Sequence, residues 1–276
     1  MKSVNRFIYS DSKEVGLNTI FSKTSSGIYV EAAGLLFFAL LWFALAYYFF
    51  SKQGSEHLNG FLPVPTLKAL IKSMTQGYFW LSAWASFRRV FVGILIASII
   101  GVPLGIAIGY YPNFRKFTYS PVQFVRMISP LSWMPVALLV FASFESAVTF
   151  LIVMACVCPI ILNTAIGVFN VNPQWVKMAM NQGAGHIQLL RTIIFPYLIP
   201  YMLTSVRLAL GIAWVVLVPA EFLGVSSGLG YLISDARDTM EYDRLMAMII
   251  AIGMIGFTLD RILQKIQSIF SWTWAE

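Results

Sequence analysis

The sequence has few of the residues that catalysis, phosphate binding or metal coordination require. Its two histidines, His57 and His186, both fall in predicted loops, and the sequence contains no His-Glu-x-x-His motif. No glycine is followed by lysine, so the chain lacks the P-loop that cradles the phosphates of a nucleotide. General acid–base catalysis has few candidate residues. These absences argue against an integral-membrane enzyme, and they assign any nucleotide-driven work to another polypeptide.

Charge and cysteine are also scarce. Charged residues make up 11% of the chain and hydrophobic residues 58%, whereas soluble domains are roughly 25% charged. The composition therefore predicts an integral membrane protein. Cys156 and Cys158 lie in an apolar run and point to nearly opposite sides of a helix, which suits packing better than a disulfide or a metal site. The net charge of +7 is scattered rather than gathered into a basic patch with exposed aromatics, so nucleic-acid binding is not predicted.

The apolar runs predict an all-α polytopic protein with about six spans. An apolar run of about twenty residues crosses a hydrocarbon core of roughly 30 Å, and the run at 31–50 is too long for a signal peptide. The predicted parts are a cytoplasmic N-terminal segment (1–30), a first span (31–50), an extracytoplasmic loop with an amphipathic helix (51–83), a core of five spans (84–266) and a C-terminal tail (267–276). Within the core, the span predicted at about 120–144 contains several prolines and is expected to be kinked.

The distribution of Lys and Arg predicts the orientation. Basic residues gather in the N-terminal segment, the 111–118 turn, the central loop and the tail, whereas the 224–244 loop is rich in Asp and Glu. The positive-inside rule then places both termini and the central loop in the cytoplasm. The residues that weaken this rule are Lys52, Lys68, Lys72, Arg88 and Arg89.

The central loop, residues 171–196, carries helix signals of its own. Asn172 is a suitable cap and Pro173 fits the first helical position. Gly183 and Gly185 are expected to end this helix, His186 to open a second short one, and Pro196 to close it. The pattern predicts a helix-turn-helix at the membrane surface. The residues expected to share one face of the first helix are Trp175, Val176, Ala179 and Met180.

The spacing of Gly183, Ala184 and Pro196 resembles the EAA loop of the membrane subunits of ABC importers, in which a Glu-Ala-Ala triplet precedes the Gly. By position this triplet falls on Lys177, Met178 and Ala179, of which only Ala179 matches. The resemblance implies that 173–195 forms coupling helices, which sit in a groove of a separate ATPase subunit. The coupling residues implied are Trp175, Lys177, Met178, Ala179, Gly183, Ala184 and Pro196.

Motifs on both sides of the loop, from about residue 60 to about residue 266, resemble in their order the permeases of the nitrate, sulfonate, taurine and bicarbonate branch. Gly228-Leu229-Gly230-Tyr231 is nearer to the sulfonate and taurine form. The motifs are Leu62-Pro63-Val64-Pro65, Phe87-Arg88-Arg89-Val90, Gly101-Val102-Pro103-Leu104-Gly105, Pro130-Leu131-Ser132-Trp133-Met134-Pro135, Pro159-Ile160-Ile161-Leu162-Asn163-Thr164, Leu203-Thr204-Ser205-Val206-Arg207-Leu208-Ala209-Leu210-Gly211, Ala220-Glu221 and Gly228-Leu229-Gly230-Tyr231-Leu232-Ile233.

The resemblance implies a type I ABC importer permease (MetI-like) fold in a bacterial inner membrane. The implied assembly is a homodimer with two ATP-binding subunits and an extracytoplasmic substrate-binding protein. ATP and Mg would be bound by the partner subunits, and no cofactor by this chain. The implied solute is a small anion such as nitrate, bicarbonate, taurine or an alkanesulfonate.

Three charged residues, Arg126, Arg207 and Glu221, fall within predicted spans. A charge near the bilayer centre costs about 2.5 kcal/mol or more, so each is expected to face a helix, a cavity or a surface. The two arginines either snorkel to headgroups and tie spans together or face the pathway and attract an anion. Glu221 is expected to pair with Arg88 or Arg89 as a gate or packing pair, with substrate contact as the alternative.

The rival interpretation is a secondary transporter or channel for a small anion that works without ATP. Such a protein would be expected to show an inverted repeat with broken helices in matching halves. The sequence contains no such repeat, so this remains the alternative.

Overall fold

The computed structural model describes residues 25–50 and 60–272. The chain consists of two compact units, Met1–Val64 and Pro65–Glu276. Three predicted features lie wholly or partly outside the described residues: most of the N-terminal segment 1–30, the first part of the 51–83 loop with His57, and the end of the tail 267–276.

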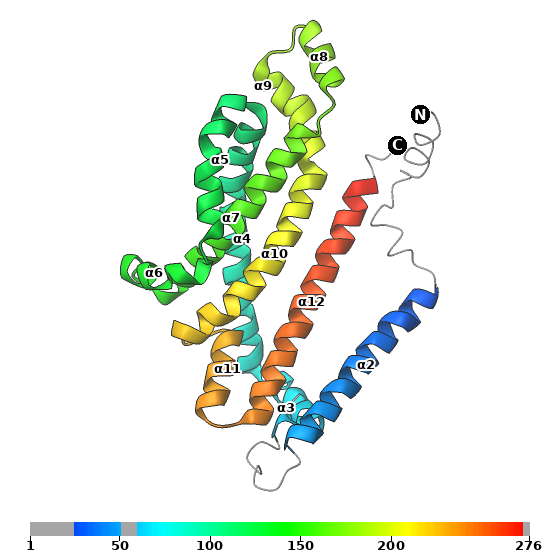
Figure 1. Cartoon of the computed structure of the whole chain (residues 1–276). Helices are drawn as coiled ribbons and strands as arrows, with labels where there is room; N and C mark the ends of the chain where they lie inside the picture. Colours follow the sequence, from blue (N-terminus) through cyan, green and yellow to red (C-terminus); the bar gives the residue numbers. More distant parts are fainter. Residues whose placement is uncertain (1–24, 51–59, 273–276) are drawn as a thin grey trace, which may run out of the picture. The chain divides into compact units, whose positions relative to one another are not determined.

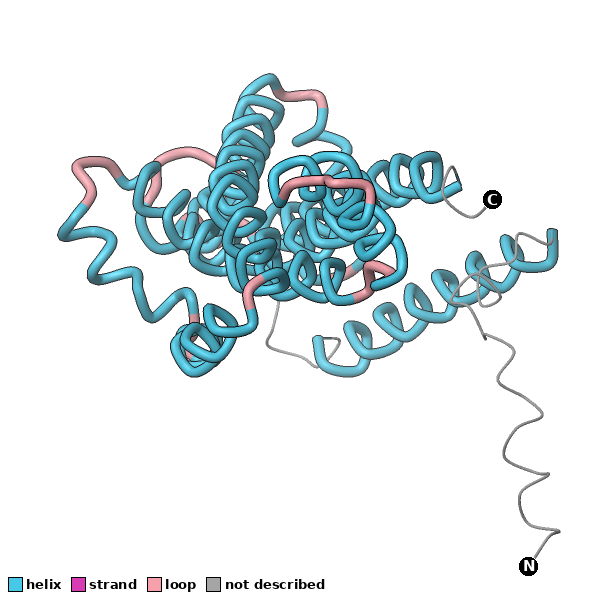
Figure 2. The backbone as a smooth tube through the Cα atoms, turned by 90° about the horizontal axis from the view of Figure 1, so that it is seen from above, coloured by secondary structure: helices cyan, strands magenta, loops and turns pink. Residues whose placement is uncertain are grey.

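Every regular element in the described ranges is helical (Figure 1), and the loops that the structure describes between helices are short (Figure 2). The all-α prediction is confirmed. The first unit contains α2 (Ser25–Phe50), and α3 (Pro63–Met74) begins at the boundary between the units. The second unit continues with α4 (Gly77–Tyr110), α5 (Pro112–Met127), η2 (Pro130–Trp133), α6 (Met134–Val140), α7 (Phe144–Phe169), α8 (Pro173–Asn181), α9 (His186–Leu189), the π-helical turn η3 (Leu190–Ile194), α10 (Phe195–Gly224), α11 (Leu229–Asp238) and α12 (Tyr242–Trp272).

Among the described residues, four helical segments are long and apolar enough to cross a membrane: Gly77–Tyr110, Phe144–Phe169, His186–Gly224 and Tyr242–Ile269. The bent pair Pro112–Met127 and Pro130–Val140 brings the number to five if it counts as one span. The predicted first span, 31–50, lies in α2, whose apolar part is Leu36–Tyr48.

The predicted span at 120–144 is broken rather than kinked. Its first helix, α5, begins at Pro112 and ends at Met127, and the two parts meet at 87°. Ser129 is extended, with φ −61° and ψ 128°, because the ring of a following proline disfavours the helical conformation. Pro130 then opens a short 3-10 helix. Prolines therefore divide a segment that length and hydropathy alone present as one span.

Close packing of α4 on α7 organises the second unit. A Cβ added at any of four α4 glycines would lie within 3 Å of an α7 side chain. The pairs are Gly93–Ile152, Gly101–Ile160, Gly105–Thr164 and Gly109–Val168. Both members advance together along the chain, so the two helices run parallel. Small residues at such a seam let the helix backbones approach closely. This matters in a membrane, where apolar side chains gain nothing by leaving the equally apolar lipid, so helices associate through close packing.

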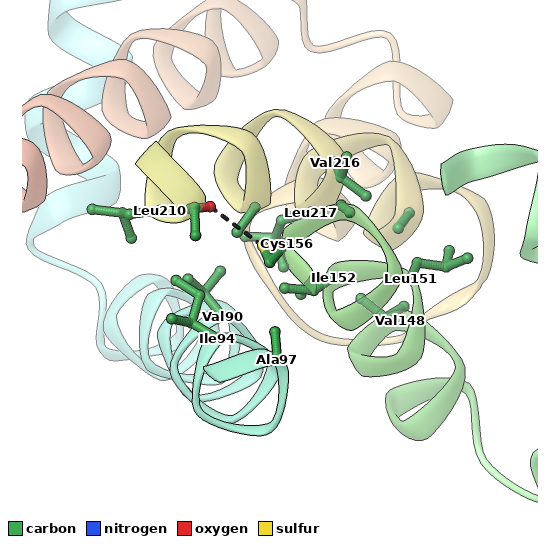
Figure 3. Close-up of a cluster of buried hydrophobic side chains, with 14 of the residues drawn as sticks. Val90, Ile94, Ala97, Val148, Leu151, Ile152, Cys156, Leu210, Val216 and Leu217 are labelled. Carbon is green, nitrogen blue, oxygen red and sulfur yellow. Dashed lines mark hydrogen bonds between the residues drawn. The ribbon is translucent and has the colours of Figure 1, made fainter. Parts of the chain in front are cut away.

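A larger apolar core joins α4 and α7 to α10 (Figure 3). Cys156 is fully buried in this core, and its thiol donates a hydrogen bond to the carbonyl oxygen of Ala209 at 3.4 Å. Cys158 is also buried and free, which confirms the packing prediction for both cysteines. The labelled core side chains are Val90, Ile94 and Ala97 from α4, Val148, Leu151, Ile152 and Cys156 from α7, and Leu210, Val216 and Leu217 from α10.

Gly105→Ala is expected to destabilise the second unit. The new Cβ would lie 2.7 Å from the carbonyl oxygen of Ile161 and 2.6 Å from Cβ of Thr164, so the helices must separate, at a cost of about 1–3 kcal/mol. Gly253→Ala is the matched control, because no atom lies within 4 Å of its added Cβ. Thermal unfolding in detergent should show a lower midpoint for the first variant only. Equal midpoints would contradict this account of the seam.

Candidate functional site

The loop between α7 and α10 folds as the sequence predicts at the start and end of its first helix. Asn172 caps α8, its side-chain oxygen accepting a hydrogen bond from the backbone N–H of Gln174 at 2.9 Å, and Pro173 takes the first helical position. At the other end Gly183 has φ +84°. The N–H of Ala184 donates to the carbonyl of Ala179, and that of Gly183 to Met180, both at 3.0 Å. This is a Schellman motif, in which the left-handed position favours glycine.

The second helix departs from prediction at its end. His186 opens α9 as expected, but the helix continues through Pro196 into α10, so the prediction that Pro196 closes it is wrong. The intervening residues Leu190–Ile194 form a π turn, in which the N–H of Phe195 donates to the carbonyl of Leu190. Proline lacks an N–H and crowds the carbonyl four residues before it. The wider turn relieves that conflict without ending the helix.

A small apolar core attaches this loop to the spans. Val176 and Ala179 of α8 pack against a cluster contributed by α7, α9, η3 and α10, and Ile106 and Tyr110 of α4 reach the same cluster. The buried members of the cluster are Val168, Leu189, Ile194 and Leu198. Three spans therefore end at the base of one loop.

The other two residues of the predicted α8 face are not buried. Trp175 is 46% exposed and Met180 48%, because the span ends cover only the middle of that face. Trp175 still meets the ring of Tyr197 edge-on, at 6.1 Å between centroids. Met178 and Ile187 are exposed as well, at 58% and 70%.

The tip of the α8–α9 loop, which we take as residues 172–189, is thus an apolar surface. Such patches are typical of sites that bind another macromolecule. Next to it lies a hollow of about 280 Å³, lined in part by Trp175, Met178, Gln182, Gly183 and Gln188. The side chain of Lys177 is exposed and makes no hydrogen bond or ion pair with any residue that the structure describes.

At the opposite end of α10, Glu221 is fully buried. Its predicted pairing with Arg88 or Arg89 is confirmed, and the partner is Arg89. Oε1 of Glu221 lies 2.6 Å from Nη1 of Arg89, which is 2% exposed. The hydroxyl of Ser86 donates to the same carboxylate at 2.8 Å, and the backbone N–H of Gly230 donates to Oε2 at 2.9 Å. A buried ion pair is favourable only when further hydrogen bonds satisfy its remaining atoms; the Glu221 carboxylate meets this condition, whereas Nε of Arg89 is buried without a hydrogen-bond partner among the described residues.

Arg89 extends these contacts to two more elements. Its Nη1 donates to the carbonyl of Ser227 at 2.9 Å and its Nη2 to the hydroxyl of Ser227 at 2.7 Å. Nη2 also reaches Glu145 at 3.1 Å, and Glu145 pairs with Arg88 at 2.6 Å. We call this set the Glu221 network. Its members are Ser86, Arg88, Arg89, Glu145, Glu221, Ser227 and the backbone of Gly230.

The glycines of the Gly228-Leu229-Gly230-Tyr231 motif make room for this network. Gly228 has φ +117°, and a Cβ there would lie 2.5 Å from the Glu221 carboxylate. A Cβ at Gly230 would lie 2.5 Å from the carbonyl oxygen of Val218. Ser86, Ser227 and Glu145 were not predicted as members of this site, and the paired glycines are the sequence signal that a side chain approaches the backbone here.

The two intramembrane arginines lie in different surroundings. Arg207 binds Asp260 of α12 through two bonds, Nε to Oδ1 at 2.8 Å and Nη2 to Oδ2 at 3.0 Å. This pair ties α10 to α12, and Asp260 was missed from the sequence. Arg126 is exposed near the end of α5 and has no ion-pair partner among the described residues. Arg126, Arg207 and Glu221 therefore do not form one polar site in the described part of the chain.

The long apolar helices are those of a helical membrane protein, and the α8–α9 loop between two of them exposes apolar side chains. Residues 101–270 match the family model of the binding-protein-dependent transport system inner membrane component, and the chain belongs to this family. The family resemblance found in the sequence is confirmed.

Relatives and a solved structure support the same assignment. The bicarbonate transport system permease protein CmpB of Synechococcus elongatus is 32% identical over 253 residues, 87% of this chain and 88% of the relative. The nitrate import permease protein NrtB of Leptolyngbya laminosa is 33% identical over 193 residues, 70% of this chain and 69% of the relative. A chain of the inward-facing MetNI methionine ABC transporter has the same fold, with TM-score 0.53 and 15% identity over 73% of this chain and 97% of that chain.

The protein is therefore the permease subunit of an ABC importer in a membrane, and separate ATPase subunits hydrolyse the ATP. The family also implies a substrate-binding protein as a partner. The predictions of fold class, function and lack of enzymatic activity are confirmed by these relatives.

Arg89→Met is expected to destabilise the protein strongly, because it leaves the buried Glu221 carboxylate without its cation, a change that costs about 3–5 kcal/mol. Arg88→Met is the matched control, since Arg88 and Glu145 are each about half exposed and such a pair contributes about 0–1 kcal/mol. Thermal unfolding of the two purified variants should give a much lower midpoint for Arg89→Met. Similar midpoints would show that the Glu221 network does not hold these helices.

Proposed function

We propose that two copies of this chain form the translocation pathway of an importer for a small anion of the bicarbonate, nitrate, taurine or alkanesulfonate class. The observation that carries the substrate class is the similarity to a bicarbonate permease over nearly the whole of both chains, with nitrate permeases at similar identity. The assembly contains two ATP-binding subunits, which hold ATP and Mg, and one extracytoplasmic binding protein.

A cavity of about 800 Å³ along α4 and α7 supports an anion pathway. Arg88, Arg89 and Glu145 line its polar end, and apolar side chains such as Val92 and Ile96 line the rest. The cavity is open on one side of a single chain, and a second copy supplies the missing wall. Glu145 and Glu221 balance the charges of Arg88 and Arg89, so an anion meets polar groups there without a deep electrostatic trap, which permits release.

The charged residues predicted for the pathway take different roles in this proposal. Arg126 is the better cation for attracting an anion, because it is exposed and no acid neutralises it within the described residues. Arg207 is engaged by Asp260 and serves mainly to tie two spans. Glu221 holds the closed end of the pathway through Arg89.

The α8–α9 loop and the following turn, 173–195, are proposed to dock in a groove of the ATPase. The exposed apolar surface at Trp175 and Met178 supports this role, as does the attachment of the loop to the ends of three spans. The loop and both termini face the cytoplasm, in keeping with the excess of Lys and Arg on that side. ATP binding closes the ATPases, the loops move with them, and the end of the pathway at the Glu221 network opens.

Gly183→Val is expected to reduce coupling about tenfold while the protein remains in the membrane. A β-branched residue is strongly disfavoured at φ +84°. An L-residue in the left-handed conformation costs about 1–2 kcal/mol or more, which is enough to lower the share of correctly folded loops about tenfold. The strain comes from the backbone alone, since no atom lies within 4 Å of an added Cβ. Uptake and co-purification of the ATPase subunits should both fall.

Gly185→Val is the matched control for this substitution. Gly185 lies two residues away with φ −74° and ψ 164°, a conformation that valine adopts readily, and it also has open space around its Cβ. It should retain more uptake and more bound ATPase than Gly183→Val. Normal uptake by Gly183→Val would remove the coupling assignment, and uptake without any ATPase would favour the rival transporter class.

The substrate class is tested on the partner binding protein. Calorimetric titration of that protein with bicarbonate, nitrate, taurine and an alkanesulfonate should show saturable binding of at least one of them. Binding of a cation or a neutral sugar in place of all four would contradict the proposed class and leave the importer assignment unchanged.

A further inference from the structure

Tyr110 and His186 form a directional contact between the α8–α9 loop and α4. The hydroxyl of Tyr110, the last residue of α4, lies 2.6 Å from Nδ1 of His186, the first residue of α9. The two rings also meet edge to face, with 6.0 Å between centroids and 88° between planes. Among hydrogen bonds in the described ranges, this is the one that joins a side chain of α8 or α9 to a span elsewhere in the sequence.

The covalent connections explain why such a contact is needed. The helix that begins at His186 continues without a break to Gly224, so α10 follows any movement of the loop. Only the short segment between Phe169 and Pro173 separates α7 from α8. In contrast, α5, η2, α6 and α7 all lie between α4 and the loop along the chain. The ends of α4 and the loop are therefore held together by packing in the small core and by the Tyr110–His186 bond.

The far end of α4 carries residues of the Glu221 network. A helix rise of about 1.5 Å per residue puts Arg89 about 32 Å from Tyr110 along this helix, close to the thickness of a hydrocarbon core. The glycine seam fixes α4 in register along α7, which carries Glu145. A displacement applied at Tyr110 therefore reaches both Arg89 and Glu145.

We propose that Tyr110 and His186 are positioning residues that transmit movement of the ATPase-docked loop to α4 and so to the Glu221 network. This inference rests on the proposed coupling role of the α8–α9 loop. Without the bond, α10 still follows the ATPase, but the loop passes less of its movement to α4 and to the α7 helix packed on it, so ATP is hydrolysed with less transport.

The test uses Tyr110→Phe in the complete transporter, reconstituted in liposomes with its ATPase subunits and binding protein. The variant removes one hydroxyl and keeps the ring. Tyr111→Phe is the matched control, because Tyr111 is the next residue, is 53% exposed and makes no side-chain hydrogen bond within the described residues. Uptake per ATP hydrolysed should fall about fivefold or more for Tyr110→Phe, the loss expected from a coupling of about 1 kcal/mol, and should stay unchanged for the control.

Variants of the partner residue make the result specific. His186→Ala should lower uptake per ATP as much as Tyr110→Phe, and His186→Asn should restore part of it, because an Asn side chain places a polar atom near the position of Nδ1. The double variant Tyr110→Phe/His186→Ala should be no worse than either single one, as expected when both remove the same interaction.

Two results would overturn the inference. One is wild-type uptake per ATP in Tyr110→Phe. The other is a loss of uptake in proportion to lost ATPase subunits, with uptake per ATP unchanged, which would make the bond merely structural. The Gly183→Val variant measures separately whether the proposed coupling role of the loop itself fails. If that variant loses coupling as expected while Tyr110→Phe matches Tyr111→Phe, only the present inference fails.

Discussion

The second unit depends on the exclusion of unpaired charge from its interior. Glu221 is fully buried and is held by Arg89, Ser86 and the N–H of Gly230, which joins α4, α10 and α11 around one carboxylate. Glu145 adds α7 through the same arginine. Each contact is needed because a buried ion with a missing partner costs more than the complete pair contributes. This requirement fixes one end of the bundle and explains the two glycines beside the carboxylate.

The opposite end of the bundle exposes apolar side chains. The α8–α9 loop is anchored by a small apolar core, while Trp175, Met178 and Ile187 remain exposed. Its helices are set by local signals, the Asn172 cap and the Gly183 Schellman motif, so the loop keeps its shape without tertiary cover. Long helices then connect this end, which we propose docks the ATPase, to the end that holds the Glu221 ion pair.

Local signals were readable in the sequence, and long-range partners were not. The cap, the glycine that ends α8 and the pairing of Glu221 with one of two arginines follow from residue type and spacing. Asp260 could not be assigned to Arg207, because nothing in the sequence indicates which span faces which. Pro196 was predicted to end a helix because proline disrupts the hydrogen bonds of an α-helical turn. A π turn precedes it instead, so the helix continues through the proline. The Tyr110–His186 bond has no local signature at all.

The central claim is that the α8–α9 loop is the ATPase-docking element and lies on the cytoplasmic side. Labelling of Met178→Cys by a membrane-impermeant maleimide tests it most directly, because Met178 is exposed whereas the native Cys156 and Cys158 are buried. The account predicts labelling in inside-out vesicles alone and protection when the ATPase subunits are bound. Labelling from the outer face, or labelling that bound ATPase subunits leave unchanged, would contradict it.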